Sequence, residues 1–111
     1  MTVPLIENVN MHNIDFSGQQ LEGLNVYWSN FWNVSFEGAK LAGAEFIEDE
    51  LHNVSFAYAD LRGARFYVST IFACDCRGAD LRGAALPGSY EEHYAHQEGM
   101  ICDNTTRFEV W

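Results

Sequence analysis

The segment FEGAKLAGAEFIEDELHNVSFAYADLRGARF, residues 36–66, carries an apolar residue at every fifth position. Outward from this segment, the same spacing extends from Ile6 to Leu86 without a break, and it stops at Glu91. An α-helix repeats about every 3.6 residues and a strand every second residue, so a period of five fits neither. The spacing instead predicts a short strand and a corner, repeated along the chain.

Two further positions complete the repeat. Two residues before each apolar centre the side chain is mostly small or branched, as at Val34, Ala39 and Ala44. Strand alternation points these side chains to the same inner face as the centre. Two residues after the centre the chain must turn, and a corner with positive φ favours glycine. Glycine occupies that position at Gly18, Gly23, Gly38, Gly43, Gly63, Gly78, Gly83 and Gly88.

A longer period of twenty residues is also visible, because residues 13–32, 33–52 and 53–72 align with one another. Four repeats of five would make one square coil, and about four such coils would stack roughly 4.8 Å apart. Equivalent residues would then form inner columns, such as Phe16, Phe36, Phe56 and Cys76, or Leu21, Leu41, Leu61 and Leu81. The sequence therefore predicts an all-β solenoid.

The sequence Ala-Asp-Leu-Arg-Gly occurs at residues 59–63 and again at 79–83. With the small residue, the Asp or Asn and the Leu or Phe of its other repeats, the chain resembles the pentapeptide-repeat family over about residues 4–88. The resemblance implies a right-handed quadrilateral parallel β-helix. It also implies a function, because the best-understood members are acidic rods that mimic duplex DNA and protect or inhibit type II topoisomerases such as gyrase. By the same resemblance, a rod of this kind could block another DNA-handling complex, such as a phage-defence nucleic-acid complex, as phage-encoded mimics do.

We expect one domain, with the β-helix in residues 1–88 and a C-terminal capping segment in residues 89–111. Ser89 is a suitable N-cap for a short helix with acidic residues in its first turn, and Gly99 would end that helix. A solenoid needs a cap over its last coil. The large apolar side chains of the tail fit that role better than a free tail.

The amino-acid composition limits the classes of molecule that the protein is expected to bind. The formal net charge of −10 disfavours direct binding to nucleic acid or to an anionic membrane, and it favours a protein partner with a basic surface. No signal peptide and no membrane span stand out. An odd number of cysteines, three, suggests reduced thiols and a cytoplasmic location.

No catalytic or metal centre is predicted. Cys74 and Cys76 occupy inward positions, which indicates a patch of core, although with His93, His96 and Cys102 they offer zinc-ligand atoms at a spacing that matches no strong pattern. No nucleophile with a base, phosphate loop or carboxylate pair is apparent, so we expect no enzyme activity and no cofactor. A polar inward column of Ser29, Asp49 and Ser69 has two interpretations. Either the hydroxyls satisfy Asp49, or the corner is distorted so that the carboxylate reaches water.

The predicted binding surface lies where the repeat is broken. Two sides of the square keep their corner glycines, whereas the other two replace most of them, as at Trp28, Glu48 and Val68. The same two sides place apolar residues outward and gather the acidic run Glu45, Glu48, Asp49 and Glu50, while the arginines lie mostly on or near the Leu21 side. Aromatic anchors ringed by charge are typical of binding hot spots. The predicted partner-binding residues are Tyr27, Trp28, Trp32, Glu45, Ile47, Glu48, Glu50, Tyr67 and Phe72.

Two function classes remain open at this point. The first is a non-catalytic DNA mimic that inhibits or protects a DNA-handling enzyme, although a rod of about 20 Å is shorter than one DNA turn of about 34 Å. The second is a structural or protein–protein interaction module with an unrelated partner. The stripe of Tyr27, Ile47 and Tyr67 would also allow a homodimer, unless the tail folds back over it.

Overall fold

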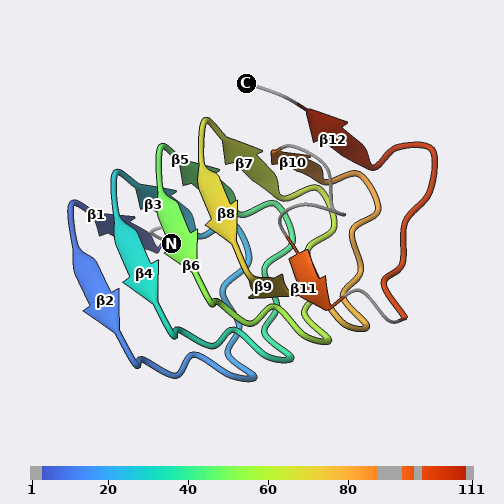
Figure 1. Ribbon diagram of the computed structural model, residues 1–111. Helices are drawn as coiled ribbons and strands as arrows, with labels where there is room; N and C mark the ends of the chain where they lie inside the picture. The colour runs from blue at the N-terminus through green and yellow to red at the C-terminus, as the bar shows by residue number, and fades with distance from the viewer. Residues whose placement is uncertain (1–3, 88–93, 97–98, 110–111) are drawn as a thin grey trace.

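The chain is a parallel β-helix of about five turns, seen in a computed structural model that describes residues 4–87, 94–96 and 99–109 (Figure 1). The described residues form short strands joined by corners and contain no helix. The strands are β1 (Leu5–Glu7), β2 (Asn10–His12), β3 (Asn25–Tyr27), β4 (Asn30–Trp32), β5 (Glu45–Ile47), β6 (Glu50–His52), β7 (Arg65–Tyr67), β8 (Thr70–Phe72), β9 (Cys74–Asp75), β10 (Ala85–Pro87), β11 (Tyr94–His96) and β12 (Arg107–Glu109). The predicted all-β quadrilateral β-helix is confirmed.

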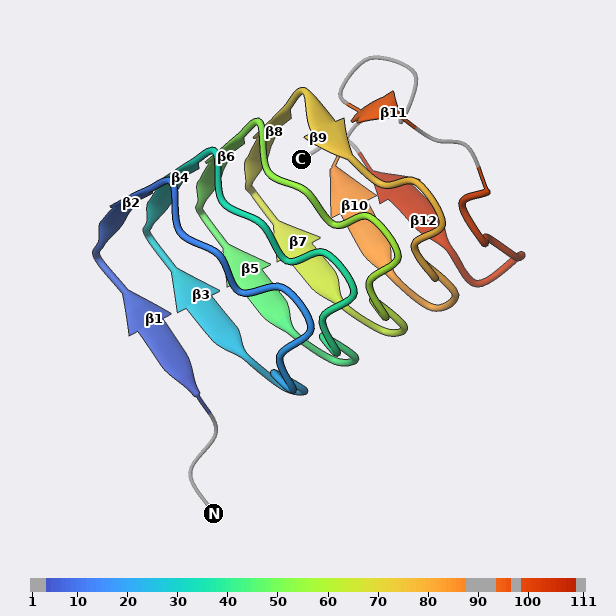
Figure 2. The ribbon, with the colours of Figure 1, turned by 90° about the horizontal axis from the view of Figure 1, so that it is seen from below.

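Each coil has four sides, which stack along the axis of the solenoid (Figure 2). Side one is the six-stranded parallel sheet β1-β3-β5-β7-β10-β12, and side two is the four-stranded parallel sheet β2-β4-β6-β8. Side three combines the β9–β11 pair with single-residue bridges at Asp15, Ser35, Ser55 and Asp75. Side four has only bridges, at Gln20, Lys40, Asp60, Asp80 and Ile101. The sides that lack corner glycines are therefore the two with regular sheets.

The core consists of the predicted inner columns. Phe36, Phe46, Phe56 and Phe66 are at most 1% exposed, since each is covered by the coils above and below. Within a column the rings stack, with centroids 5.5 Å apart for Phe36 and Phe56 and 4.6 Å apart for Phe46 and Phe66. Across the interior, rings from sides one and three meet edge to face, as Phe46 and Phe56 do at 88°. Both geometries are favourable for aromatic pairs.

Corners on all four sides use left-handed backbone. The glycine corners have φ between 65° and 76°, as predicted. The corners without glycine have the same conformation, with φ between 52° and 60° at Asn8, Asn13, Trp28, Asn33, Glu48, Asn53, Tyr58, Val68 and Ala73. Asparagine tolerates this conformation well, whereas a β-branched residue such as Val68 is strained there. Loss of glycine therefore leaves the corner geometry unchanged, and it adds local strain where a residue such as Val68 replaces the glycine.

The prediction of a short helical cap was wrong where the structure describes it, because Tyr94–His96 is strand β11. The predicted N-cap, Ser89, lies outside the described residues. The described tail instead continues the solenoid, which explains why about five turns are present rather than the predicted four. Paired residues of neighbouring coils are 20 residues apart in the sequence at Cys74 and Tyr94, and 22 residues apart at Leu86 and Phe108. Two extra residues in the last turn hide its repeat from a search at a fixed period.

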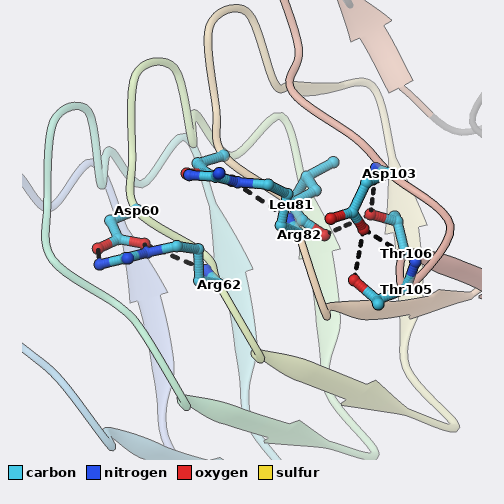
Figure 3. Close-up of polar contacts among 8 residues, drawn as sticks. Asp60, Arg62, Leu81, Arg82, Asp103, Thr105 and Thr106 are labelled. Carbon is cyan, nitrogen blue, oxygen red and sulfur yellow. Dashed lines mark hydrogen bonds and ion pairs between the residues drawn. The ribbon is translucent and has the colours of Figure 1, made fainter.

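Hydrogen bonds join this last turn to the one before it (Figure 3). The Thr106 hydroxyl donates to the Leu81 carbonyl at 2.7 Å, and the Arg107 amide donates to the Ala84 carbonyl at 2.8 Å. Met100 and Phe108 pack against the core. At the opposite end, the inner residues of the first coil are only partly buried, because the described chain covers them from one side.

Candidate functional site: a corner between two sheets

The nine predicted binding residues lie on sides one and two and on the corner that joins these sheets. We call this set the corner surface: Tyr27, Trp28, Trp32, Glu45, Ile47, Glu48, Glu50, Tyr67 and Phe72. All nine belong to β3 to β8 or to the corner residues between these strands. Strands in register on adjacent coils bring equivalent residues together, so the surface is continuous.

Side one contributes a column of Tyr27, Ile47 and Tyr67, which are direct neighbours on β3, β5 and β7. All three side chains are half-buried, so the column is less exposed than the sequence suggested. The Arg65 guanidinium lies 6.0 Å from the centroid of the Tyr67 ring, within the range of a cation–π contact.

Side two contributes a continuous stack of rings along the axis. Trp32 stacks on His12 at 4.7 Å and on His52 at 5.5 Å, with interplanar angles of 5° and 4°. Phe72 extends the stack beyond His52 at 6.2 Å and is 64% exposed. The rings of His12, Trp32 and His52 are therefore parallel, whereas the Phe72 ring, the most exposed of the four, is tilted by 49° against His52.

The corner itself carries Trp28, Glu48 and Val68, of which Trp28 and Val68 are more than half exposed. The indole Nε1 of Trp28 donates to Glu48 Oε2 at 2.9 Å, so the exposed ring is held in one orientation. Glu48, Glu45 and Glu50 all belong to one coil. The carboxylates therefore form a band across the axis of the solenoid rather than a row along it.

Asp49 does not belong to the surface, contrary to its place in the predicted acidic run. It is 1% exposed, and its Oδ1 accepts the Ser29 amide at 2.8 Å, while Oδ2 has no hydrogen-bond partner. Burial raises the pKa of Asp49 to about 7. The hydroxyls of Ser29 and Ser69 accept the amides of Val9 and Asp49, each from the preceding coil. Asp49 is thus one member of a buried ladder that pairs backbone amides between coils, and neither hydroxyl is bonded to its carboxylate.

Opposite the corner surface, sides three and four carry arginines that are paired within their own repeat. Arg62 donates Nε and a terminal nitrogen to the two oxygens of Asp60, both at 2.8 Å, and Arg82 binds Asp80 in the same way (Figure 3). Arg77 binds Asp75 likewise. These guanidinium groups hold the pKa values of Asp60 and Asp80 below their usual range. The sequence analysis missed these pairs, although Asp-x-Arg at three corners was their signal.

Cys74 and Cys76 are buried and unbonded to each other, which confirms their predicted place in the core. Burial raises the pKa of the Cys74 thiol to about 12 and that of Cys76 further. Within residues 4–87, 94–96 and 99–109, no cluster of three metal-ligating side chains is found, and His93 lies outside these ranges. The described chain likewise offers no helix with the length and apolarity to cross a bilayer.

Comparison with known proteins supports the fold. Residues 29–67 match the model of pentapeptide repeats, with eight copies. A pentapeptide repeat protein from the Arabidopsis thaliana thylakoid lumen has a similar structure, with 32% identity, a TM-score of 0.68, and alignment over 83% of this chain and 60% of that one. The chain thus spans less than two thirds of that protein. No curated protein matches the sequence.

Two further solved structures are more distant. Rfr23 from the cyanobacterium Cyanothece aligns over 96% of this chain and 88% of its own, with 21% identity and a TM-score of 0.49. QnrB1, a plasmid-mediated fluoroquinolone resistance protein, aligns over 86% and 92% with 14% identity and a TM-score of 0.32. Neither likeness is close enough to bear on function. The repeat match, the stacked coils and the similarity to the plant protein together place this chain in the pentapeptide-repeat family.

Proposed function

We propose that the protein is a non-catalytic binding module that docks a protein partner with a basic surface on the corner surface. The observation that carries the proposal is the fixed, half-exposed indole of Trp28, hydrogen bonded to Glu48 at the edge where two aromatic-bearing sheets meet. Tryptophan is among the residues that contribute most to binding when it enters a pocket on a partner.

The geometry favours tight docking for two reasons. The Trp28 ring and the His12–Trp32–His52 stack are already ordered by their own contacts, so binding costs little side-chain entropy. The band of Glu45, Glu48 and Glu50 supplies carboxylates beside these rings, which would attract and orient arginine or lysine side chains.

DNA mimicry is the less supported form of this function. The Cα atoms extend 31 × 27 × 23 Å, whereas one turn of DNA is about 34 Å long. The band of carboxylates crosses the axis, and the neighbours of Glu45 along the axis are Asn25 and Arg65, which do not continue a row of negative charge. A DNA-handling enzyme is then one basic partner among others.

The test is a pull-down experiment with two variants of equal net charge, each used as the bait. Glu48→Gln with Glu50→Gln neutralises two exposed carboxylates of the corner surface, and Glu22→Gln with Glu37→Gln neutralises two exposed carboxylates elsewhere. We expect a partner captured by the wild type to be lost with the first bait and kept with the second. Its affinity should fall with salt, because exposed charges steer the association. Equal capture by both baits would place the binding site elsewhere, and competition by duplex DNA would identify a DNA-binding cleft.

A further inference from the structure

A groove of about 400 Å³ lies on side three, beside the corner that joins this side to side two. Its lining residues come from three successive coils and are Asn33, Val34, Ser35, Asn53, Val54, Ser55, Ala73 and Asp75. None of these residues belongs to the corner surface. The volume falls within the range of about 300 to 1,000 Å³ that ligand pockets occupy, so the groove can admit a small molecule.

Two columns of polar side chains form the walls of the groove. Asn33 and Asn53 are exposed corner residues, whereas Ser35 and Ser55 are half-buried bridge partners on side three. Equivalent residues of neighbouring coils lie roughly 4.8 Å apart. The valine side chains between the two columns are buried in the core. The groove therefore presents amide and hydroxyl groups at a regular spacing, with little exposed apolar surface between them.

The column of asparagines ends at Ala73, and this leaves a gap in the wall. Asn53 donates from Nδ2 to Asn33 Oδ1 in the preceding coil. In the next coil Ala73 has nearly the same left-handed backbone, with φ of 55° against 54° at Asn53, but it has no amide group. Among the described residues, Asn53 Oδ1 therefore has no hydrogen-bond donor. The space over Ala73 is the place that the next amide of the column would occupy.

The other groups of the groove are neutral or already paired. The Ala57 amide donates to the Ser55 hydroxyl oxygen at 3.3 Å, which leaves the hydroxyl proton for a ligand. Asp75 carries the formal charge of the lining, and its two oxygens accept Arg77 Nε at 3.2 and 3.1 Å. The backbone of side three is paired between coils, so an extended peptide cannot add a strand there. These features favour a neutral ligand that is rich in hydroxyl and amide groups.

We propose that the groove binds an N-acetylated sugar chain that lies along the axis of the solenoid. The acetamido group of one sugar fills the gap over Ala73, and its N–H donates to Asn53 Oδ1 in place of the missing asparagine. Sugar hydroxyl oxygens accept the Ser55 proton and the Nδ2 hydrogens of Asn33. A few placed polar groups, rather than charge, then determine the orientation and the specificity of binding.

The test titrates the intact chain with tri-N-acetylchitotriose and with cellotriose, which has hydroxyl groups in place of the acetamido groups. Calorimetry gives the affinities, and NMR of the Asn53 side-chain amide reports contact at the groove. We expect saturable binding of tri-N-acetylchitotriose. Cellotriose should bind at least about tenfold more weakly, because its hydroxyl group leaves the gap over Ala73 unfilled.

Two variants test the gap, and each uses a residue that the same corner already accommodates. Ala73→Asn supplies the missing amide and fills the gap, and asparagine occupies this corner at Asn33 and Asn53. Asn53→Ala removes the acceptor, and Ala73 shows that alanine fits the corner. Each should weaken binding of tri-N-acetylchitotriose about tenfold or more. Asn13→Ala is the matched control, because Asn13 has the same corner conformation but does not line the groove, and it should leave the affinity unchanged.

Absence of saturable binding in the wild type, or equal affinities for the two sugars, would overturn the proposal. So would an affinity that Ala73→Asn and Asn53→Ala leave unchanged, or that Asn13→Ala lowers equally. Cooperative thermal unfolding of each variant shows that the comparison is made on folded protein. Capture of a protein partner on the corner surface is a separate measurement, and its failure would not bear on this groove.

Discussion

Asp49→Ser should stabilise the protein, and the gain should grow with pH. Asp49 lies between Ser29 and Ser69 in the buried ladder, and those serines accept the same kind of inter-coil amide. A serine at position 49 can accept the Ser29 amide that Asp49 Oδ1 accepts now. The substitution therefore keeps the ladder and removes a carboxyl group whose second oxygen has no partner.

The magnitude follows from the pKa of Asp49. Burial raises this pKa from 3.8 to about 7, so the folded state holds the proton more tightly than the unfolded state. Below pH 3.8 both states are protonated and ionisation costs the fold nothing. Between pH 3.8 and 7 the unfolded state ionises first, so stability falls as pH rises, and above pH 7 the full cost is reached. About three pH units at about 1.4 kcal/mol each give roughly 4 kcal/mol.

The assay is urea unfolding of wild type and Asp49→Ser at pH 4.5 and pH 8. The stability difference between them should widen by about 3 kcal/mol over this interval. Asp15→Ser is the matched control, because Asp15 is exposed, its pKa is lowered by bonds to Ser17, and the next coils carry Ser35 and Ser55 at its position. Asp15→Ser should not reproduce the gain in the free energy of unfolding that Asp49→Ser gives at high pH. A difference for Asp49→Ser that stays constant with pH would refute the reasoning.

Two other substitutions or modifications test the corners and the core. Val68→Asn should raise the free energy of unfolding by about 1 kcal/mol in urea titrations, because asparagine tolerates the left-handed φ of 52° and the side chain is 59% exposed. The control Thr70→Asn changes a residue in an extended strand and should give no gain in stability. An equal gain from Thr70→Asn would contradict the role of φ. A thiol reagent should label exposed Cys102 in native protein and reach Cys74 and Cys76 only after denaturation, since burial raises their pKa values. Rapid native labelling of all three thiols by mass spectrometry would argue against the buried positions.

The coil and its inner columns could be predicted because one physical requirement, burial of every fifth side chain, recurs without interruption. Phe36, Leu41 and Phe46 are fully buried as that period demands. The corners could be placed but not fully interpreted. The sequence shows which corners lack glycine, but it does not show that Trp28 and Val68 adopt the same left-handed backbone as the glycines.

Three features of the structure could not be predicted from the sequence, each for a physical reason. Strand β11 was taken for a helix because its turn contains extra residues, which conceal the match of Gly99 and Ile101 to Gly78 and Asp80. The role of Asp49 depends on which backbone amide it reaches, and a period cannot show this. The pocket lined by Arg65, Ala85 and Arg107 depends on the pairing of Ala85 with Arg107 across a 22-residue offset, which follows only once β12 is known. The binding roles of the corner surface stay a prediction.

The two extra residues of the last described turn also bear on whether copies of this protein can join end to end. Stacked coils end in strands with unpaired edges, and such edges can template growth by addition of another chain. A regular coil returns to its starting point after 20 residues, whereas the last turn needs 22 to pass from Leu86 to Phe108 and has an irregular pairing between Tyr94 and His96. A regular coil of a second molecule cannot match this edge on every side at once. We therefore expect the longer last turn to oppose end-to-end polymerisation.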